Sequence, residues 1–224
     1  MNNPMDASSF SRAQHNYYCE FEKILSKIVI CHNLMIDNGI PLPNNENLIR
    51  DKLVNNYINN PKIKRKIEFP YFVFPEAQEI PTGRTDIRIQ HPNSYYDQNT
   101  EYYIIECKRI DNTNIRGTTG LNALYISEGI YRFVSNYYSS HYFTNGMIGF
   151  VVEPMDIHDN IKTINHLLKN NFHQANTNRE ISQQNFIPDF KYHYNSEHKT
   201  KNGSRLRLYH LMFDFSSLIH QKKK

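Results

Sequence analysis

The sequence EYYIIECKRI at residues 101–110 decides the fold that we expect for this chain. It is rich in β-branched and aromatic residues over a length typical of a strand, so it predicts a long, largely buried β-strand. Side chains two apart on a strand share a face. Glu106 and Lys108 therefore point to one side of the sheet, while Ile105 and Cys107 point to the other. The strand carries two opposite charges into a sheet that is otherwise apolar.

The preceding segment, RTDIRIQ at residues 84–90, alternates polar and apolar residues and predicts a half-buried strand. Its isoleucines, Ile87 and Ile89, face the core. If the two strands are neighbours, Asp86 lies close to Glu106 and Lys108. Buried charges are costly without partners, so this convergence predicts a functional site. The residues that share the polar face of the first strand are Arg84, Asp86, Arg88 and Gln90.

Hydrophobic periodicity on either side of these strands predicts a mixed α/β domain with one central sheet flanked by helices. A helix is expected to begin at a capping residue, Asn44 or Asn45, with Glu46 in its first turn, and to end at Pro61. A strand over 67–74 follows it. Further helices are expected over 17–38, 121–138 and 159–170, and further strands over 147–152 and 206–215. We expect one domain over residues 1–224.

Composition narrows the class of protein. The 224 residues are 39% hydrophobic, enough for one domain to bury its own core, and the formal net charge is +4, which tolerates a polyanionic partner. No apolar run approaches the roughly 20 residues of a membrane-spanning helix, and Met1–Phe10 lacks the features of a signal peptide. Cys19, Cys31 and Cys107 show no CxxC spacing, as in a reducing compartment. We therefore expect a cytoplasmic protein without a membrane partner.

The residues on the two strands suit a hard divalent cation. Asp86 and Glu106 offer carboxylate oxygens, and the backbone carbonyl of Cys107 offers a third ligand. A cation held there activates water and neutralises charge that develops on a phosphoryl oxygen. Lys108 either positions the attacking water or, with a depressed pKa, assists its deprotonation. The predicted reaction is metal-dependent hydrolysis of a phosphodiester.

Asp86, followed 20 positions later by Glu106-Cys107-Lys108, resembles the D…(D/E)xK signature of the PD-(D/E)xK nuclease superfamily. The resemblance covers about residues 44–152 and implies a restriction-endonuclease-like core in the order αβββαβ, with the N-terminal helix and the C-terminal segment appended. It places the catalytic residues on Asp86, Glu106 and Lys108, and an assisting metal ligand on Glu46. The implied cofactor is Mg²⁺ or Mn²⁺. Thr85 stands where the motif has proline.

Bland interpretations of the same residues stay open. Glu106 and Lys108 alternatively form surface cross-strand pairs with Asp86 and Arg88, each worth roughly 0.2–1 kcal/mol. Glu46 alternatively serves only as a favourable carboxylate in a first helical turn.

Nucleic-acid contacts are expected from basic and aromatic residues near the strands. Arg84 and Arg88 share the face of Asp86, and Arg132 lies on the following helix, where the superfamily often has a polar residue facing the site; a solvated arginine is the alternative. Aromatic side chains stack on bases in many single-strand binders. The tyrosines that are candidates to line such a groove are Tyr137, Tyr138 and Tyr142.

The predicted function is that of a metal-dependent deoxyribonuclease, an endonuclease in bacterial restriction or antiviral defence, or in repair. The expected partner is double-stranded DNA, with selectivity supplied by loops, a homodimer or a partner protein. Nothing in the sequence selects for a 2′-hydroxyl, so RNA remains an alternative substrate. The alternative function is that of a catalytically inactive member of the fold that binds nucleic acid or a partner subunit.

Overall fold

The computed structural model describes residues 7–80, 83–93, 101–113, 116–138 and 140–219. In this part of the chain, seven strands form one mixed sheet in the order β1-β2-β3-β4-β7-β6-β5. The first three strands are antiparallel to one another, β3, β4 and β7 run parallel, and β6 and β5 are antiparallel again. The strands are β1 (Phe72–Ile80), β2 (Gly83–Gln90), β3 (Tyr103–Ile110), β4 (Thr144–Val151), β5 (Thr177–Gln183), β6 (His193–Lys199) and β7 (Arg205–Asp214).

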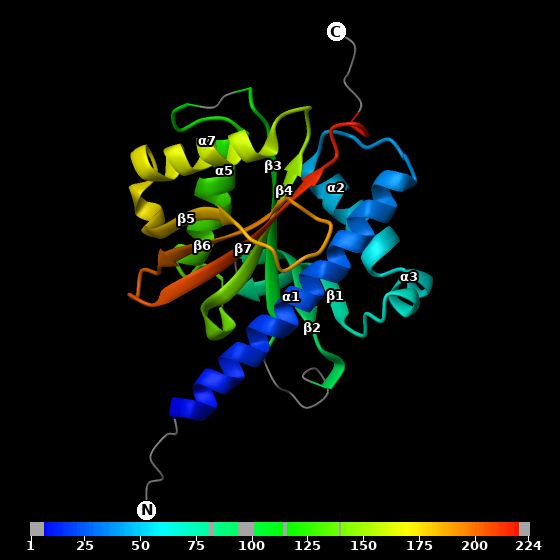
Figure 1. Ribbon diagram of the computed structural model, residues 1–224, viewed down its shortest axis with the longest axis horizontal. Helices are drawn as coiled ribbons and strands as arrows, with labels where there is room; N and C mark the ends of the chain where they lie inside the picture. The colour runs from blue at the N-terminus through cyan, green and yellow to red at the C-terminus, as the bar shows by residue number, and fades with distance from the viewer. Residues whose placement is uncertain (1–6, 81–82, 94–100, 114–115, 139, 220–224) are drawn as a thin grey trace, which may run out of the picture.

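One face of the sheet is covered by α1 (Ala7–Asp37), which crosses the strands in Figure 1. Residues three and four apart on this helix, Phe21, Ile24, Leu25 and Ile28, are buried against the sheet, as the helical repeat of apolar residues predicts. The helix is long but carries many polar residues. Neither it nor any other helix in the described ranges is apolar enough to cross a membrane.

The same face carries a chain of short helices beside α1. Helix α2 (Glu46–Leu53) begins at Asn45, whose side chain accepts a hydrogen bond from the Leu48 N–H and so satisfies one free helical donor. It continues into a π-helical turn, η1 (Val54–Ile58), and then into α3 (Pro61–Lys66).

The opposite face is covered by a second set of helices. They are α5 (Leu121–Tyr125), the π-helical turn η2 (Ile126–Ile130), α6 (Tyr131–Val134) and α7 (Ile157–Asn170). Gly149 of β4 lets this layer approach closely, because a Cβ there would lie 2.5 Å from Met212 Sδ and 3.4 Å from Tyr125 Cε2. The two faces thus hold two separate hydrophobic cores, one on each side of the sheet. The predicted α/β class, with a mixed central sheet flanked by helices, is confirmed.

The neighbouring strands β2 and β3 stay together for only a short distance. Their pairing runs from Ile89 opposite Tyr103 to Ile87 opposite Ile105. Beyond that point β2 remains paired with β1, while β3 pairs with β4 as far as Ile110. A gap therefore opens between β2 and β3, beginning at Asp86 and Glu106.

Several predicted boundaries were wrong. Pro61 begins α3 instead of ending a long helix. Asn60 accepts hydrogen bonds from the Lys62 and Ile63 N–H groups, and proline has no N–H that would need an acceptor at the first helical position.

The strand expected over 67–74 is β1, which starts at Phe72 and includes Pro75. An edge strand tolerates this proline. Helix α3 and strands β5 and β6 were not predicted from the sequence.

Candidate active site

Four of the predicted site residues meet at the gap between β2 and β3. The Lys108 ammonium lies 2.9 Å from Glu46 Oε1, 3.0 Å from Glu106 Oε1 and 3.7 Å from Asp86 Oδ2. It also donates to the backbone carbonyl of Cys107 at 2.9 Å. Asp86 and Glu106 lie on the same face of the sheet, and Glu46 reaches them from the first turn of α2. Three carboxylates thus surround one cation.

The gap itself explains why two of these carboxylates are there. Backbone N–H groups of β3 that face the gap have no strand partner, and a buried N–H without an acceptor is costly. The Cys107 N–H donates to Asp86 Oδ2 at 2.8 Å, and the Arg109 N–H donates to Glu46 Oε2 at 3.0 Å. The side chains of Asp86 and Glu46 therefore replace the carbonyls of a missing strand. This fixes both carboxylates next to Lys108.

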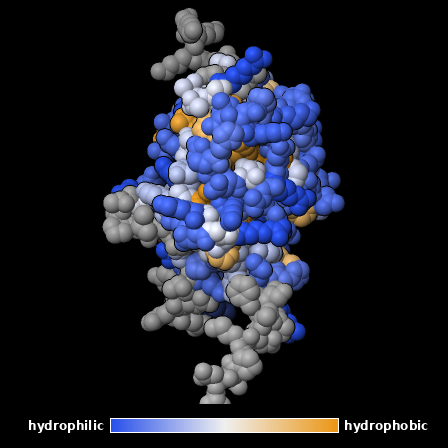
Figure 2. All heavy atoms as spheres, turned by 90° about the vertical axis from the view of Figure 1, so that its left-hand side faces the viewer, coloured by the Kyte–Doolittle hydropathy of each residue, from blue (hydrophilic) through white to orange (hydrophobic). Residues whose placement is uncertain are grey.

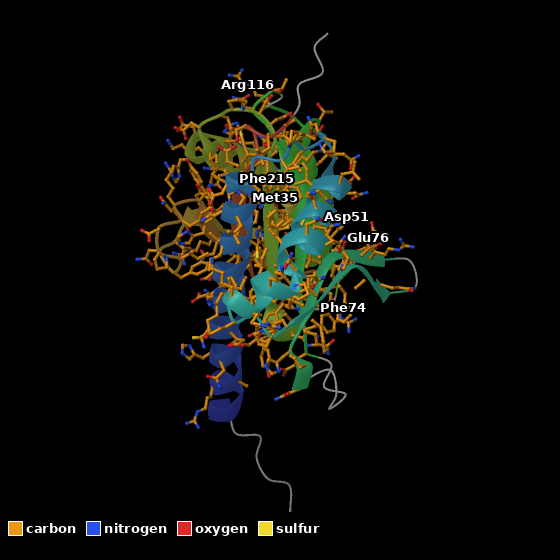
Figure 3. The ribbon with its side chains drawn as sticks, turned by 90° about the vertical axis from the view of Figure 1, so that its right-hand side faces the viewer. Met35, Asp51, Phe74, Glu76, Arg116 and Phe215 are labelled. Atoms are coloured by element: carbon orange, nitrogen blue, oxygen red, sulfur yellow. The ribbon has the colours of Figure 1, made fainter. Side chains whose placement is uncertain are left out.

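Arg50, which the sequence analysis did not single out, holds Asp86 from the other side. Its side chain is only 3% exposed and bonds Asp86 Oδ1 at 2.8 Å and Glu76 Oε1 at 2.9 Å. It also bonds Asp51, and Figure 3 shows Asp51 and Glu76 on the same side of the molecule. The signal that was available is its spacing: Arg50 follows Glu46 by four helical positions, so both share one face of α2.

Glu106 is completely buried and both its oxygens are bonded. Oε1 accepts from Arg132 at 2.7 Å, and Oε2 lies 2.9 Å from the Tyr138 hydroxyl. That hydroxyl also lies 2.9 Å from the carbonyl of Arg84 and accepts from Arg132. The suggestion that Tyr138 stacks on bases is wrong, because the residue is 3% exposed and its hydroxyl orients Glu106 instead.

The charges in the cluster shift each other's protonation. Burial, and then repulsion by Asp86, raise the pKa of Glu106 in spite of the opposing effects of Lys108 and Arg132. Burial alone lowers the pKa of Lys108, but Glu106, Asp86 and Glu46 together raise it above its ordinary value. Among these groups Lys108 thus stays protonated, which fits the first of its two expected roles, positioning the attacking water. The structure therefore favours positioning over deprotonation as its role.

The three arginines expected to contact nucleic acid lie around the cluster with different exposure. The Arg84 side chain is 71% exposed and approaches Glu76 at 3.7 Å. Arg88 is half-buried and stacks on the Tyr102 ring at 4.4 Å. Arg132 is 34% exposed although its guanidinium bonds Glu106, so it lies between the buried carboxylate and solvent.

The two remaining tyrosines of the expected groove make contacts of their own. Tyr137 lies under the Arg132 guanidinium at 5.7 Å, and the Tyr142 hydroxyl donates to Glu101.

Access to the cluster is through a hollow of about 220 Å³ beside Lys108 and Glu46, which Arg109, Leu121 and Glu128 also line. Larger hollows, of about 660 and 510 Å³, lie away from the cluster along the β5–β6 segment and the end of α7. Volume therefore does not single out the cluster, and the arrangement of charges does.

The donor set fits a hard divalent cation in its chemistry. Carboxylates of Asp86, Glu106 and Glu46 and the carbonyl of Cys107 are the oxygen ligands that Mg²⁺ and Mn²⁺ take, and all four converge on one positive charge. Within the described ranges, no group of three or more His, Cys, Asp and Glu side chains has a geometry ready to hold a metal.

Comparison with protein-family models, with curated proteins and with solved structures found no match for this chain. Its function therefore has to be argued from the geometry of the cluster.

Proposed function

We propose that this protein is a metal-dependent nuclease of restriction-endonuclease-like architecture that hydrolyses phosphodiester bonds of double-stranded DNA. The observation that carries the proposal is the meeting of Asp86, Glu106 and Glu46 around Lys108 where β2 and β3 separate. The order of elements from α2 to β4, namely helix, three strands, helix and strand, agrees with the core implied by the PD-(D/E)xK resemblance. A cytoplasmic role in restriction, antiviral defence or repair fits this activity.

In this proposal the metal, Mg²⁺ or Mn²⁺, would be held by Asp86, Glu106 and the Cys107 carbonyl, with Glu46 assisting. When bound, it stabilises negative charge that develops on the scissile phosphate. Arg50 fixes one oxygen of Asp86, so the other is aimed at the cluster. Tyr138 fixes Glu106 in the same way.

The cationic side chains take separate roles. Lys108 remains protonated and its ammonium donates a hydrogen bond to the attacking water or to a phosphate oxygen, which positions one against the other. Arg132, at the boundary between Glu106 and solvent, contacts the phosphate that is cut, and the exposed Arg84 contacts a neighbouring phosphate. Both interactions are charge-assisted hydrogen bonds.

Nicking of supercoiled plasmid with added Mn²⁺ tests the proposal. The purified chain is expected to convert supercoiled to open-circular plasmid, and Asp86→Asn and Glu106→Gln are expected to abolish this. Asp159→Asn is the matched control, because Asp159 is exposed on α7 and bonds only Lys162 and its own helix. Activity in both site variants equal to that of the control would show that cleavage does not occur at this cluster.

One observation favours the second candidate, a non-catalytic subunit that binds nucleic acid or a partner. Every carboxylate of the cluster already has a cationic partner from this chain: Lys108, Arg50 or Arg132. A binding subunit would retain duplex DNA in a mobility-shift assay and leave plasmid intact at every Mn²⁺ concentration. The nuclease would show cleavage in the same preparation.

A further inference from the structure

Helix α3 presents a group of positive charges that the cluster around Lys108 does not use. Its sequence is PKIKRK, and Lys62, Arg65 and Lys66 are exposed. None of these three side chains has an ion-pair partner among the described residues. The fourth basic residue, Lys64, is bonded to the backbone carbonyl of Tyr71. One basic residue of the helix thus has a structural contact, and the other three are exposed to solvent.

The spacing of the three exposed residues gathers them on one side. Arg65 and Lys66 follow Lys62 by three and four positions, which places both of them next to Lys62 on the helix. Like charges at this spacing destabilise a helix by about 0.2–0.5 kcal/mol per pair. Arg65 and Lys66 lie in the last turn, where the helix dipole favours cations. No described carboxylate pairs with any of the three side chains, so a polyanion from outside the chain is a partner that these charges fit.

The basic residues of another stretch of the chain do have ion-pair partners. On the β6–β7 hairpin, Arg205 bonds Glu197 at 2.6 Å and Arg207 approaches the same carboxylate at 3.6 Å. Those arginines are compensated inside the protein. The contrast marks α3, among the described residues, as a basic surface without carboxylate partners that is available to a ligand.

The position of α3 relative to the proposed active site suits a nucleic-acid backbone. Glu46 begins α2, and α2 and η1 contain eight and five residues, so α3 starts roughly 20 Å along the helical path from the cluster. Figures 1 and 3 both place α2 and α3 on the same side of the molecule.

We infer that Lys62, Arg65 and Lys66 of α3 form a phosphate-contact surface that holds duplex DNA to one side of the bond to be cut. The inference rests on the proposed nuclease function and adds the placement of the substrate. Three phosphate contacts release about three counterions, so they contribute about 2.7 to the slope of log affinity against log salt.

The test compares Lys62→Ala/Arg65→Ala/Lys66→Ala with a control that removes the same charge, Lys169→Ala/Lys199→Ala/Lys201→Ala. The control residues are exposed near the end of α7 and on the β6–β7 hairpin, at the opposite end of the sheet. Figure 2 shows that side of the molecule as largely hydrophilic. Anisotropy of a labelled 30-bp duplex, measured in EDTA between 50 and 300 mM KCl, reports affinity without cleavage, and circular dichroism checks folding.

The α3 variant is expected to lose about 2–3 from the salt slope and at least tenfold in affinity at 100 mM KCl, while the control retains wild-type values. An unchanged slope in the α3 variant, with wild-type protein that binds duplex, overturns this inference and leaves the nuclease proposal standing. If wild-type protein binds no duplex, this inference fails, and the plasmid assay with Mn²⁺ decides separately on the nuclease proposal. Loss of binding to phosphatidylserine vesicles with unchanged duplex affinity would make the surface a membrane contact, which also overturns the inference.

Discussion

At the scale of single residues, three carboxylates face the single positive charge of Lys108. Glu46, Glu106 and Asp86 all face the same ammonium. Any metal that enters has to share these oxygens with Lys108 or displace it. The lysine therefore acts on metal affinity as well as on the reaction, a role that the spacing of the motif does not reveal.

Replacing Lys108 by methionine should strengthen the binding of Mn²⁺, because methionine keeps the length of the side chain and removes the competing charge. We expect the dissociation constant to fall roughly tenfold, which corresponds to about 1.4 kcal/mol. Cleavage should fall by roughly 10²–10⁴-fold, since the positioning group is lost. Calorimetric titration beside the plasmid assay measures both. Weaker Mn²⁺ binding in the variant would show that Lys108 does not compete for the carboxylates.

Arg50 should matter for stability more than an ordinary arginine. Arg50→Met leaves Asp86, Glu76 and Asp51 close together without their cation, and we expect unfolding to become easier by about 2–4 kcal/mol. This is less than for fully buried pairs, because Glu76 is 46% exposed. Urea denaturation measures the loss, with Arg65→Met as the control, which should change stability by less than about 0.5 kcal/mol.

A double-mutant cycle locates this effect. Combined with Asp86→Asn, Arg50→Met should cost less than the sum of the two single changes, by about 0.5–3 kcal/mol, because the two side chains contact each other. Additive effects would mean that Arg50 acts through other partners.

At the scale of elements, a chain of hydrogen bonds ties α5, β7, β6 and the segment before β5 together. His198 Nδ1 must donate to the Ala175 carbonyl, so its Nε2 accepts from the Ser196 hydroxyl. Ser196 Oγ then accepts from His210 Nε2, and His210 Nδ1 accepts from the Tyr125 hydroxyl. In this arrangement both rings are neutral. Burial lowers the pKa of His198 to about 4 and that of His210 to about 3.

These two histidines should make the protein sensitive to mild acid. The unfolded chain binds their protons near pH 6.5 and the folded chain does not, so the unfolding free energy falls as the pH drops from 6.5 towards 4. The expected fall is up to about 1.4 kcal/mol per pH unit for each histidine. Glu106 opposes it, because its raised pKa lets the folded state take up a proton first.

The contribution of one histidine to the pH dependence of stability is the difference between wild type and a variant that lacks it. Urea denaturation between pH 7.5 and 5 should show a smaller decline for His210→Gln than for wild type, and His198→Gln serves if the first variant does not fold. His173→Gln, at an exposed position, should decline as wild type does. Equal slopes in all the variants would mean that the buried rings are protonated in the folded state.

The elements that could be predicted from the sequence are those with a clear apolar repeat. In α1 burial follows that repeat, and β3 is buried almost throughout, as its β-branched and aromatic residues predict. The polar segments TNREISQ and HYNSEHK show no such repeat, yet they form β5 and β6 because β7 offers an edge to pair with. Both segments become strands because they pair with neighbouring strands, and this pairing cannot be predicted from the local sequence.

At the scale of the whole molecule, the sheet brings together residues that are far apart in sequence. The Asp86–Glu106–Lys108 group was predictable because strand alternation and the spacing of two neighbouring strands fix it. Arg50 and Tyr138 were not, because their contacts depend on how α2 and the segment after α6 pack on opposite sides of the gap. Local patterns thus predicted the acidic cluster, while its supporting residues depend on tertiary packing.

Binding of a metal at this cluster should stabilise the entire fold. At a Mn²⁺ concentration 100 times the dissociation constant, the stabilisation is about 2.7 kcal/mol. For a chain of this size it corresponds to a rise in the unfolding temperature of about 5–10 °C. Thermal unfolding with and without Mn²⁺ should show this rise in wild type and in Asp159→Asn. The rise should be absent in Asp86→Asn and Glu106→Gln, and its persistence there would place the metal elsewhere.

The gap between β2 and β3 has a consequence for spectroscopy. The Cys107 amide hydrogen is protected from exchange with solvent deuterium by a side chain, the Asp86 carboxylate, where a strand would otherwise protect it. Its exchange rate and chemical shift therefore report the occupation of the cluster directly, while amides of β4 and β7 report only global opening. A nuclear magnetic resonance signal from this one amide would follow substrate or metal entering the site in real time, without any label attached to the protein.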